Sequence, residues 1–273
     1  MPIEQKSASI LKPRNPGIDL DAPIPRHWLD DNVAATHIAN GVNLLFPAGE
    51  RFFVRSVNRF LPRIDNPELR AQVKGFFGQE GRHAKEHDRV FTLLEDQGFE
   101  LKRFLRVYEA LAFGVLERVF PAELALATTA ACEHYTALLA EDALSIAVLD
   151  GAHPTMRALL LWHAAEEIEH RAVAFDVLQE INPSLGLRAG GLALATVSLA
   201  GFWVAATTML LVQDREVGVA RFVRDWKAAQ AKEPDDGVFF RGLRAYLKKD
   251  FHPSQNDVDK LAADYLASAG LPQ

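Results

Sequence analysis

Apolar residues recur every three or four positions over long stretches of this 273-residue chain, whereas the alternation typical of strands is scarce. The first stretch covers residues 29–61 and contains Pro47, which predicts a break just before Glu50 because proline cannot continue the helical hydrogen bonds. The second stretch covers residues 67–97, begins at an Asn-Pro start signal and ends before Gly98. We therefore expect two long helices here, the first of them broken.

A second pair of helices is predicted farther along the chain, over residues 121–149 and 155–181. The amphipathic segment 99–119 separates the two pairs, which indicates short loops within each pair and a longer connection between them. The chain is thereby expected to be all-α, a four-helix bundle with additional C-terminal helices.

The segments outside these helices differ in character. Residues 1–25 are polar and contain several prolines, so we expect an irregular arm ahead of the bundle at 26–183. Residues 184–213 include an uncharged stretch, 189–212, that is long enough to span a bilayer. Its glycines and threonines dilute its hydrophobicity, so packing on the bundle, a dimer interface and membrane association all stay open. Residues 214–273 are expected to form an amphipathic helical extension.

Composition narrows the functional classes. The formal net charge is −6 and the basic residues are dispersed among acidic ones, so no nucleic-acid partner is expected. The single cysteine, Cys132, fits a reducing compartment, and we expect it to be a small core residue. No continuous apolar segment of a secretory signal occurs near Met1. These observations indicate a cytoplasmic protein, with membrane association left open.

Two short motifs carry the candidate chemistry, Glu80-Gly-Arg-His83 and Glu167-Ile-Glu-His170. In each motif a glutamate precedes a histidine by three residues within a helix-forming stretch. Both side chains of a motif therefore lie on one helical face, about one turn apart, where they can bind the same ion.

A lone glutamate in an apolar setting lies ahead of each motif, Glu50 before the first and Glu133 before the second. A buried unpaired carboxylate at Glu133 would be costly, whereas Glu50 could instead be a first-turn residue favoured by the helix dipole. The order Glu, Glu-x-x-His, Glu, Glu-x-x-His is the ligand set of a dinuclear metal site in a four-helix bundle. We expect two metal ions, iron first, with manganese or zinc as alternatives.

Other polar residues lie near these motifs. His87 and His163 are each one turn from a motif residue, and each could be a further ligand or could orient one. His163, beside Trp162 in an apolar run, is the better candidate for the metal set. Tyr135 is expected to be a core residue with a satisfied hydroxyl group. The residues expected at the surface or in turns are His134, His153, Glu86, Glu166 and Glu169.

The ligand order resembles that of the ferritin-like dinuclear iron carboxylate superfamily. The stretches 46–53, 79–87 and 162–170 look more narrowly like a bacterial family described as predicted metal-dependent hydrolases, with the resemblance covering residues 25–215. This resemblance implies a ferritin-like bundle with a metal centre. The additional histidines are similar to those of a subgroup of arylamine oxygenases. The predicted metal ligands are Glu50, Glu80, His83, Glu133, His163, Glu167 and His170.

Two enzymatic hypotheses follow. The first is a di-iron enzyme that activates dioxygen and oxidises a small, apolar organic substrate, which leaves open an electron-donor protein as partner. The alternative is a metal-dependent hydrolase that uses a metal-bridged hydroxide. Metal storage, or a structural metalloprotein, is a third class. A homodimer is expected, and a peripheral membrane contact stays open.

Overall fold

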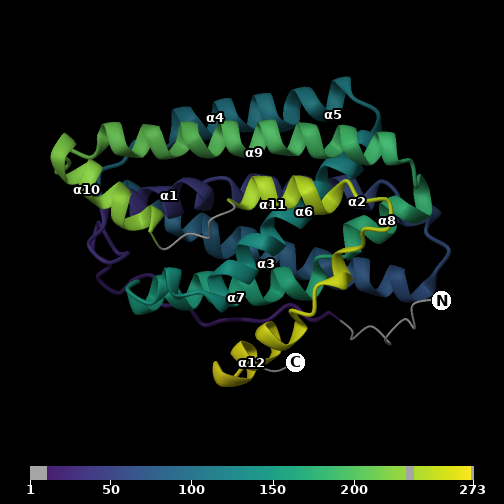
Figure 1. Ribbon diagram of the computed structural model, residues 1–273, viewed down its shortest axis with the longest axis horizontal. Coiled ribbons are helices and arrows are strands. Elements are labelled where there is room, and N and C mark those ends of the chain that lie inside the picture. The colour runs from purple at the N-terminus through teal and green to yellow at the C-terminus, as the bar shows by residue number, and fades with distance from the viewer. Residues whose placement is uncertain (1–10, 232–236, 272–273) are drawn as a thin grey trace.

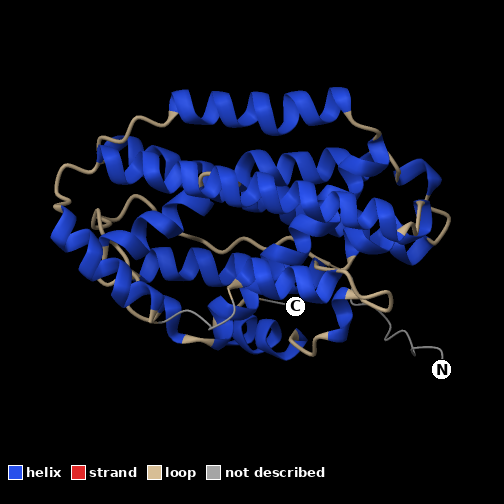
Figure 2. Cartoon of the chain, turned by 45° about the horizontal axis from the view of Figure 1, so that its top comes forward, coloured by secondary structure: helices blue, strands red, loops and turns tan. Residues whose placement is uncertain are grey.

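A computed structural model describes residues 11–231 and 237–271, and no strand occurs within these ranges (Figure 1, Figure 2). The all-α prediction is confirmed. A π-helical turn, Ala110–Val115, interrupts the segment between residues 102 and 119. The helices are α1 (Val33–Asn43), α2 (Phe46–Asn58), α3 (Pro67–Asp96), α4 (Lys102–Glu109), α5 (Leu116–Val119), α6 (Ala122–Ser145), α7 (Pro154–His170), α8 (Val173–Ile181), α9 (Leu185–Gln213), α10 (Val219–Gln230), α11 (Val238–Tyr246) and α12 (Asp259–Ser268).

The first predicted helix is broken at another position than expected, and the helix predicted over residues 155–181 is broken where no break was expected. The first breaks between α1 and α2 at Leu44 and Leu45, so the break precedes Phe46. Pro47 lies in the first turn of α2, where its missing N–H group removes no helical hydrogen bond. The predicted helix 155–181 divides after His170 into α7 and α8.

The start and end of α3 follow the sequence signals. The side chain of Asn66 accepts hydrogen bonds from the backbone N–H groups of Glu68 and Leu69, at 2.9 and 3.3 Å. Just beyond the other end of the helix, Gly98 adopts a φ of 90°, which a residue with a side chain rarely adopts.

Four helices surround a common interior. Helix α2 contacts α3 and α6, and α7 contacts the same two helices. Aromatic side chains fill this interior close to the predicted ligands: Phe76 packs against the ring of His170, and Trp162 packs against the ring of His83. Burial of each such aromatic side chain contributes roughly 2–3 kcal/mol. The ligand motifs are thereby held on four packed helices.

The uncharged stretch lies within one helix, α9, which runs across the upper part of the molecule in Figure 1, below α4 and α5 in that view. One side of α9 packs on α6 and α1, with Gly191 against the backbone of Ala127. The other side is exposed, including Val197 and Val204. By length and composition this helix would be able to cross a membrane. The structure therefore shows packing along one side of α9 only.

The arm and the C-terminal extension cover the core. The described part of the predicted arm, residues 11–25, is irregular but contributes buried side chains, among them Leu11 and Arg14. It lies against α3 where Gly75 and Gly78 leave room, since a Cβ atom at Gly75 would come within 2.5 Å of Leu11. Residues 1–10 of the predicted arm lie outside the described part. In the extension, α10 packs on α1, α11 on α6, and α12 on α7.

Candidate metal centre

The seven predicted ligands lie together in the interior of the four helices, and all are buried. Helix α2 contributes one of them, α3 two, α6 one and α7 three. In chain order they are Glu50, Glu80, His83, Glu133, His163, Glu167 and His170.

Their ligand atoms form two groups. In the first, Glu50, His83 and His163 offer atoms that all lie within 4.8 Å of one another. The His163 Nε2 atom is 3.5 Å from Glu50 Oε1. One carboxylate and two imidazoles therefore face a space that is suited to a single cation.

The second group contains Glu80, Glu133 and His170, whose ligand atoms also lie within 4.8 Å of one another. The Nε2 atom of His170 is 3.1 Å from Glu80 Oε1 and 3.5 Å from Glu133 Oε2. Two carboxylates and one imidazole thus face a second space for a cation.

Glu167 lies between the two groups. Its Oε1 atom is 2.8 Å from His163 Nε2, 3.5 Å from His83 Nδ1 and 3.4 Å from His170 Nε2. Glu80 also forms a group with Glu167 and His83. These two glutamates are therefore the residues that would contact both cations if two were bound.

The carboxylates of this cluster lack hydrogen-bond partners. Neither side-chain oxygen of Glu50, Glu80 or Glu133 makes a hydrogen bond, although all three residues are buried. Burial raises the pKa of Glu50 and of Glu133 well above the ordinary value, and the neighbouring Glu80 raises both further. Unpaired buried polar groups cost about 1–3 kcal/mol each, and more when charged. Cations among these oxygens would remove this penalty.

The first of the inward-facing histidines, His163, is held through a relay. Asn43 Oδ1 accepts a hydrogen bond from Nδ1 of His87, which leaves His87 Nε2 as an acceptor. The Nδ1 atom of His163, 2.6 Å away, can then donate to His87. Burial lowers the pKa of His87 well below its ordinary value and that of His163 to about 4, so both rings are neutral at pH 7. The lone pair of His163 Nε2 is thus directed at Glu50 and Glu167, and His87 is a positioning residue.

His83 is held by a buried ion pair. Its Nε2 atom donates to Glu166 Oε2 at 3.0 Å, while the other oxygen of Glu166 accepts from Arg14 at 3.1 Å. The Nδ1 atom of His83 therefore faces the centre. Although burial lowers the pKa of His83, the hydrogen bonds to Glu166 and Glu167 raise it to about 8, which shows how strongly this space attracts positive charge.

The same arginine holds the second motif histidine. Arg14 makes two hydrogen bonds to Glu169, at 2.6 and 2.8 Å, and Glu169 accepts a further one from Gln79 Nε2 at 2.9 Å. The Oε1 atom of Gln79 accepts from Nδ1 of His170 at 3.1 Å. His170 Nε2 is therefore directed inward. Carboxylate and amide groups behind a histidine fix its tautomer in metal sites, and His83 and His170 follow that pattern, whereas His163 is held by the imidazole of His87.

The prediction that Glu86, Glu166 and Glu169 are solvated charges is wrong. Glu166 is fully buried, and Glu86 is buried beside Arg89 at 2.7 Å. Glu169 is partly buried beside Arg14. Helical spacing placed these residues away from the ligand face correctly, but it could not show that the arm covers the opposite face.

His134 is also not a surface residue. It is buried between α6 and α11, where its Nε2 atom lies 3.2 Å from the carbonyl oxygen of Gly242. His153 precedes α7 in a turn, as expected. Tyr135 is a core residue whose hydroxyl group lies 2.6 Å from that of Thr196. Burial raises the pKa of the Cys132 thiol to about 12, so it stays protonated.

A large cavity of about 900 Å³ reaches the centre at His163 and Glu167. Arg224 and Asp31, which have exposed side chains, also line it, so the cavity reaches the surface near these two residues. Its walls are mainly apolar and include Ile38, Val42, Leu139, Ala143, Leu160 and Phe239.

A smaller cavity of about 60 Å³ lies on the other side of Phe46, with Glu50 in its wall. Phe113 of the π-helical turn and Phe202 of α9 close it. Phe46 lines both cavities and packs against the rings of His87 and His163. The centre is thus approached by two cavities that differ greatly in size.

The described helices bring buried carboxylates and imidazole rings together in one interior. Such a set of side chains is typical of metal-dependent proteins. The family model described as "Predicted metal-dependent hydrolase" matches residues 12–257, and this chain belongs to that family. The match includes Arg14 in the arm and extends through α11. No curated protein matches the chain, and no solved structure does so either.

Proposed function

We propose that this protein is a hydrolase that holds two metal ions and acts on an apolar organic substrate. The observation that carries the proposal is the large apolar cavity, whose inner end is formed by two candidate ligands, His163 and Glu167. Membership of the metal-dependent hydrolase family supports the reaction class. Ligand sites are commonly apolar cavities with a few convergent polar groups.

Each group of side chains has a distinct role in this proposal. Glu50, His83 and His163 would hold one ion, and the second group described above would hold the other, with Glu167 between them. The bound ions would supply a water molecule of lowered pKa, so that hydroxide is available near neutral pH. The cavity walls would orient the substrate and exclude bulk water. Because His163 lines the cavity, its ring must keep one tautomer. The hydrogen bond between His163 Nδ1 and His87 Nε2 fixes that tautomer.

A second candidate is dioxygen activation by two iron ions, with oxidation of an apolar substrate and an electron-donor protein as partner. Two observations favour it. Four of the seven candidate donors are glutamates and all seven are carried on helices, whereas hydrolytic dinuclear sites usually recruit aspartates and histidines from loops. The small cavity beside Glu50 has room for a small molecule such as dioxygen.

The two candidates are separated by metal content, turnover and oxygen uptake. Protein purified without chelator would be analysed for metals and assayed with p-nitrophenyl esters of increasing acyl length. Oxygen uptake would be followed after anaerobic reduction. Two ions per chain with ester hydrolysis and no oxygen uptake support the hydrolase. Stoichiometric oxygen uptake by an iron-loaded protein without ester turnover would favour the second candidate, and a protein that binds no metal would exclude both.

A further inference from the structure

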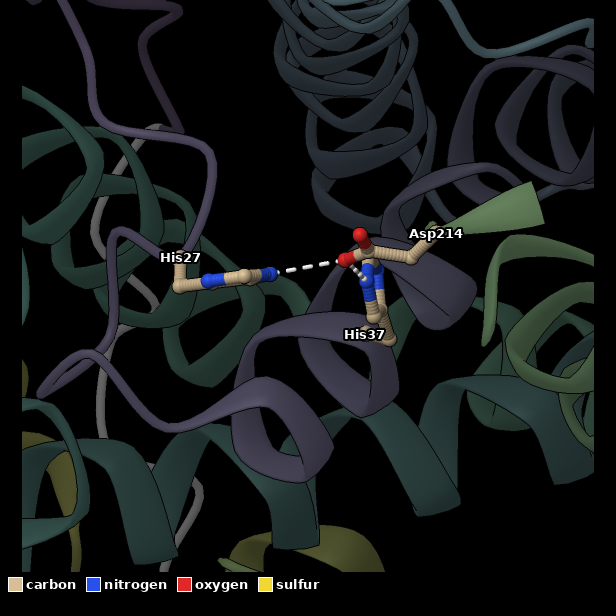
Figure 3. A group of neighbouring side chains, drawn as sticks. All are labelled: His27, His37 and Asp214. Atoms are coloured by element: carbon tan, nitrogen blue, oxygen red, sulfur yellow. Dashed lines mark hydrogen bonds and ion pairs between the residues drawn. The ribbon is translucent and has the colours of Figure 1, made fainter. Parts of the chain in front are cut away.

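A second cluster of side chains that could bind a metal lies on segments that contribute none of the seven candidate ligands described above. His27 follows the arm, His37 belongs to α1, and Asp214 caps the end of α9. Figure 3 shows the two imidazole rings directed at one carboxylate, and each Nε2 atom lies 2.7 Å from Asp214 Oδ2. All three residues are buried, and their ligand atoms lie within 4.8 Å of one another.

The surroundings of the cluster favour a cation. Asp214 stands at the C-terminal end of the long helix α9, where the helix dipole is negative. Although burial raises the pKa of Asp214, the hydrogen bonds from His27 and His37 lower it to about 2, so the carboxylate is ionised. Burial lowers the pKa of His37, which keeps that ring neutral. One carboxylate with two imidazoles is a donor set that binds divalent transition metals.

The outer nitrogens of the two rings differ. The Nδ1 atom of His37 is buried and has no hydrogen-bond partner. The Nδ1 atom of His27 lies 3.7 Å from Asp31 Oδ1, so this carboxylate can accept its proton. A carboxylate behind a histidine is a common arrangement in metal sites.

Two arginines stand near the cluster and oppose a cation. Arg26 lies 3.9 Å from Asp214 Oδ1, and Arg221 lies 3.4 Å from His27 Nδ1. Both side chains are partly exposed, and each is also paired with another carboxylate, Glu216 or Asp31. They can therefore turn outward, and their charge should make this cluster bind metal more weakly than the carboxylate-rich centre.

We propose that His27, His37 and Asp214 form a second, mononuclear site for a divalent transition metal ion such as Zn²⁺. Binding replaces the two N–H···O hydrogen bonds by metal–nitrogen and metal–oxygen bonds. Each imidazole proton then moves from Nε2 to Nδ1, and no proton is released. Because α1 lines the large cavity, the ion would fasten the arm and the end of α9 to one of the cavity walls.

The test counts zinc bound to the metal-free full-length protein, by equilibrium dialysis and elemental analysis. The wild type should bind three ions per chain and the Asp214→Asn variant two. This substitution keeps an oxygen that accepts both N–H groups, so the hydrogen-bonded arrangement survives. Asp225→Asn is the matched control, because Asp225 is equally buried, accepts from Val33 N and pairs with Arg221 and Arg224 instead of a histidine. It should retain three ions.

The difference of one ion between wild type and Asp214→Asn tests this site independently of the proposed function. If the main centre bound no metal, the counts would be one and zero. A double variant, Glu80→Ala with His170→Ala, should retain a single ion and show a rise in melting temperature on addition of Zn²⁺. Equal zinc counts in wild type and Asp214→Asn, or no ion in the double variant, would show that the cluster is held together by hydrogen bonds and binds no metal.

Discussion

Two of the three histidines that face the candidate metal centre each depend on one particular oxygen atom behind the ring. For His83 that atom belongs to Glu166, and for His170 it belongs to Gln79. Both lines of hydrogen bonds meet at Arg14, which reaches the site from the irregular arm. The arm therefore helps to fix the orientation of candidate ligands on two different helices, α3 and α7.

Removal of a central ligand should abolish metal binding without unfolding the helices. Glu80 belongs to the second group and also lies beside His83 and Glu167, which face the first group, so Glu80→Ala is expected to lose both ions of the centre, while the far-UV circular dichroism stays helical. The variant also relieves the repulsion among buried carboxylates in the metal-free protein. Elemental analysis checks the prediction, and retention of two ions would contradict the assignment.

The carboxylate behind His83 should contribute to metal affinity through orientation alone. Glu166→Gln keeps the size of the side chain but replaces a charged acceptor by a neutral one, so we expect metal affinity to fall about 10- to 100-fold. Competition with a chromogenic chelator measures it. Glu86→Gln is the control, because Glu86 is a buried glutamate paired with Arg89 and makes no bond to a ligand histidine. Equal losses of metal affinity in both variants would contradict the role of Glu166 in orienting His83.

Among the secondary-structure elements, the approach of α9 to α6 depends on the absence of a side chain. A Cβ atom at Gly191 would lie 2.4 Å from the carbonyl carbon of Ala127. At Gly201, on the same helix, nothing lies within 4 Å of the corresponding position. A side chain is therefore expected to have opposite effects at these two glycines of α9.

Alanine at these two glycines should change stability in opposite directions. Gly191→Ala forces α9 away from α6 and is expected to cost about 1–3 kcal/mol of unfolding free energy, as overpacking does. Gly201→Ala should instead stabilise the protein by up to about 1 kcal/mol, because alanine favours helix. Denaturant unfolding measures both variants. A destabilisation at Gly201 equal to that at Gly191 would refute the packing explanation.

The contact between α6 and α11 should make stability depend on pH. Burial lowers the pKa of His134 to about 4, below its ordinary value of 6.5. Between about pH 4 and pH 6.5, the unfolded chain therefore binds a proton at His134 that the folded protein does not bind. The associated stability is fully present above about pH 6.5 and is lost as the pH falls toward 4, by about 3 kcal/mol in total.

This pH dependence is measured as a difference. Unfolding free energies of wild type and His134→Gln would be compared from pH 8 to pH 4, with glutamine placed to donate to the Gly242 carbonyl group. The wild type should lose more stability on acidification than the variant. Parallel curves would mean that His134 does not contribute.

At the scale of the whole molecule, the exposed side of α9 is the most prominent apolar surface. Its outward residues recur every three or four positions and carry no charge, and Val197 and Val204 are 73% and 66% exposed. Glycines and alanines between them would allow another helix to come close. We propose that a second copy of the chain packs there, since an isologous contact lets one surface serve both partners.

Charge placed on this surface should separate two copies. The double variant Val197→Glu with Val204→Glu is expected to be a monomer with unchanged helicity, whereas the wild type should be a dimer by light scattering. Binding of the monomeric wild type to lipid vesicles, lost in the variant, would instead identify the surface as a membrane contact.

Local periodicity determined the part of the site that lies on single helices. Within Glu80-x-x-His83 and Glu167-x-x-His170, spacing alone places both side chains on one face, and this does not depend on the rest of the fold. The same reasoning gave the all-α class and the start of α3 at Asn66. These features depend on residues within a turn or two of one another, which a sequence displays directly.

Only the tertiary structure decided which residues stand behind the ligands. Glu166 is buried because Arg14, far away in the chain, covers its face of α7. His27, His37 and Asp214 come together from three segments, and no spacing between them is a signal. Such groups meet because helices and arm pack against one another, and packing depends on the shape of whole surfaces rather than on any local pattern.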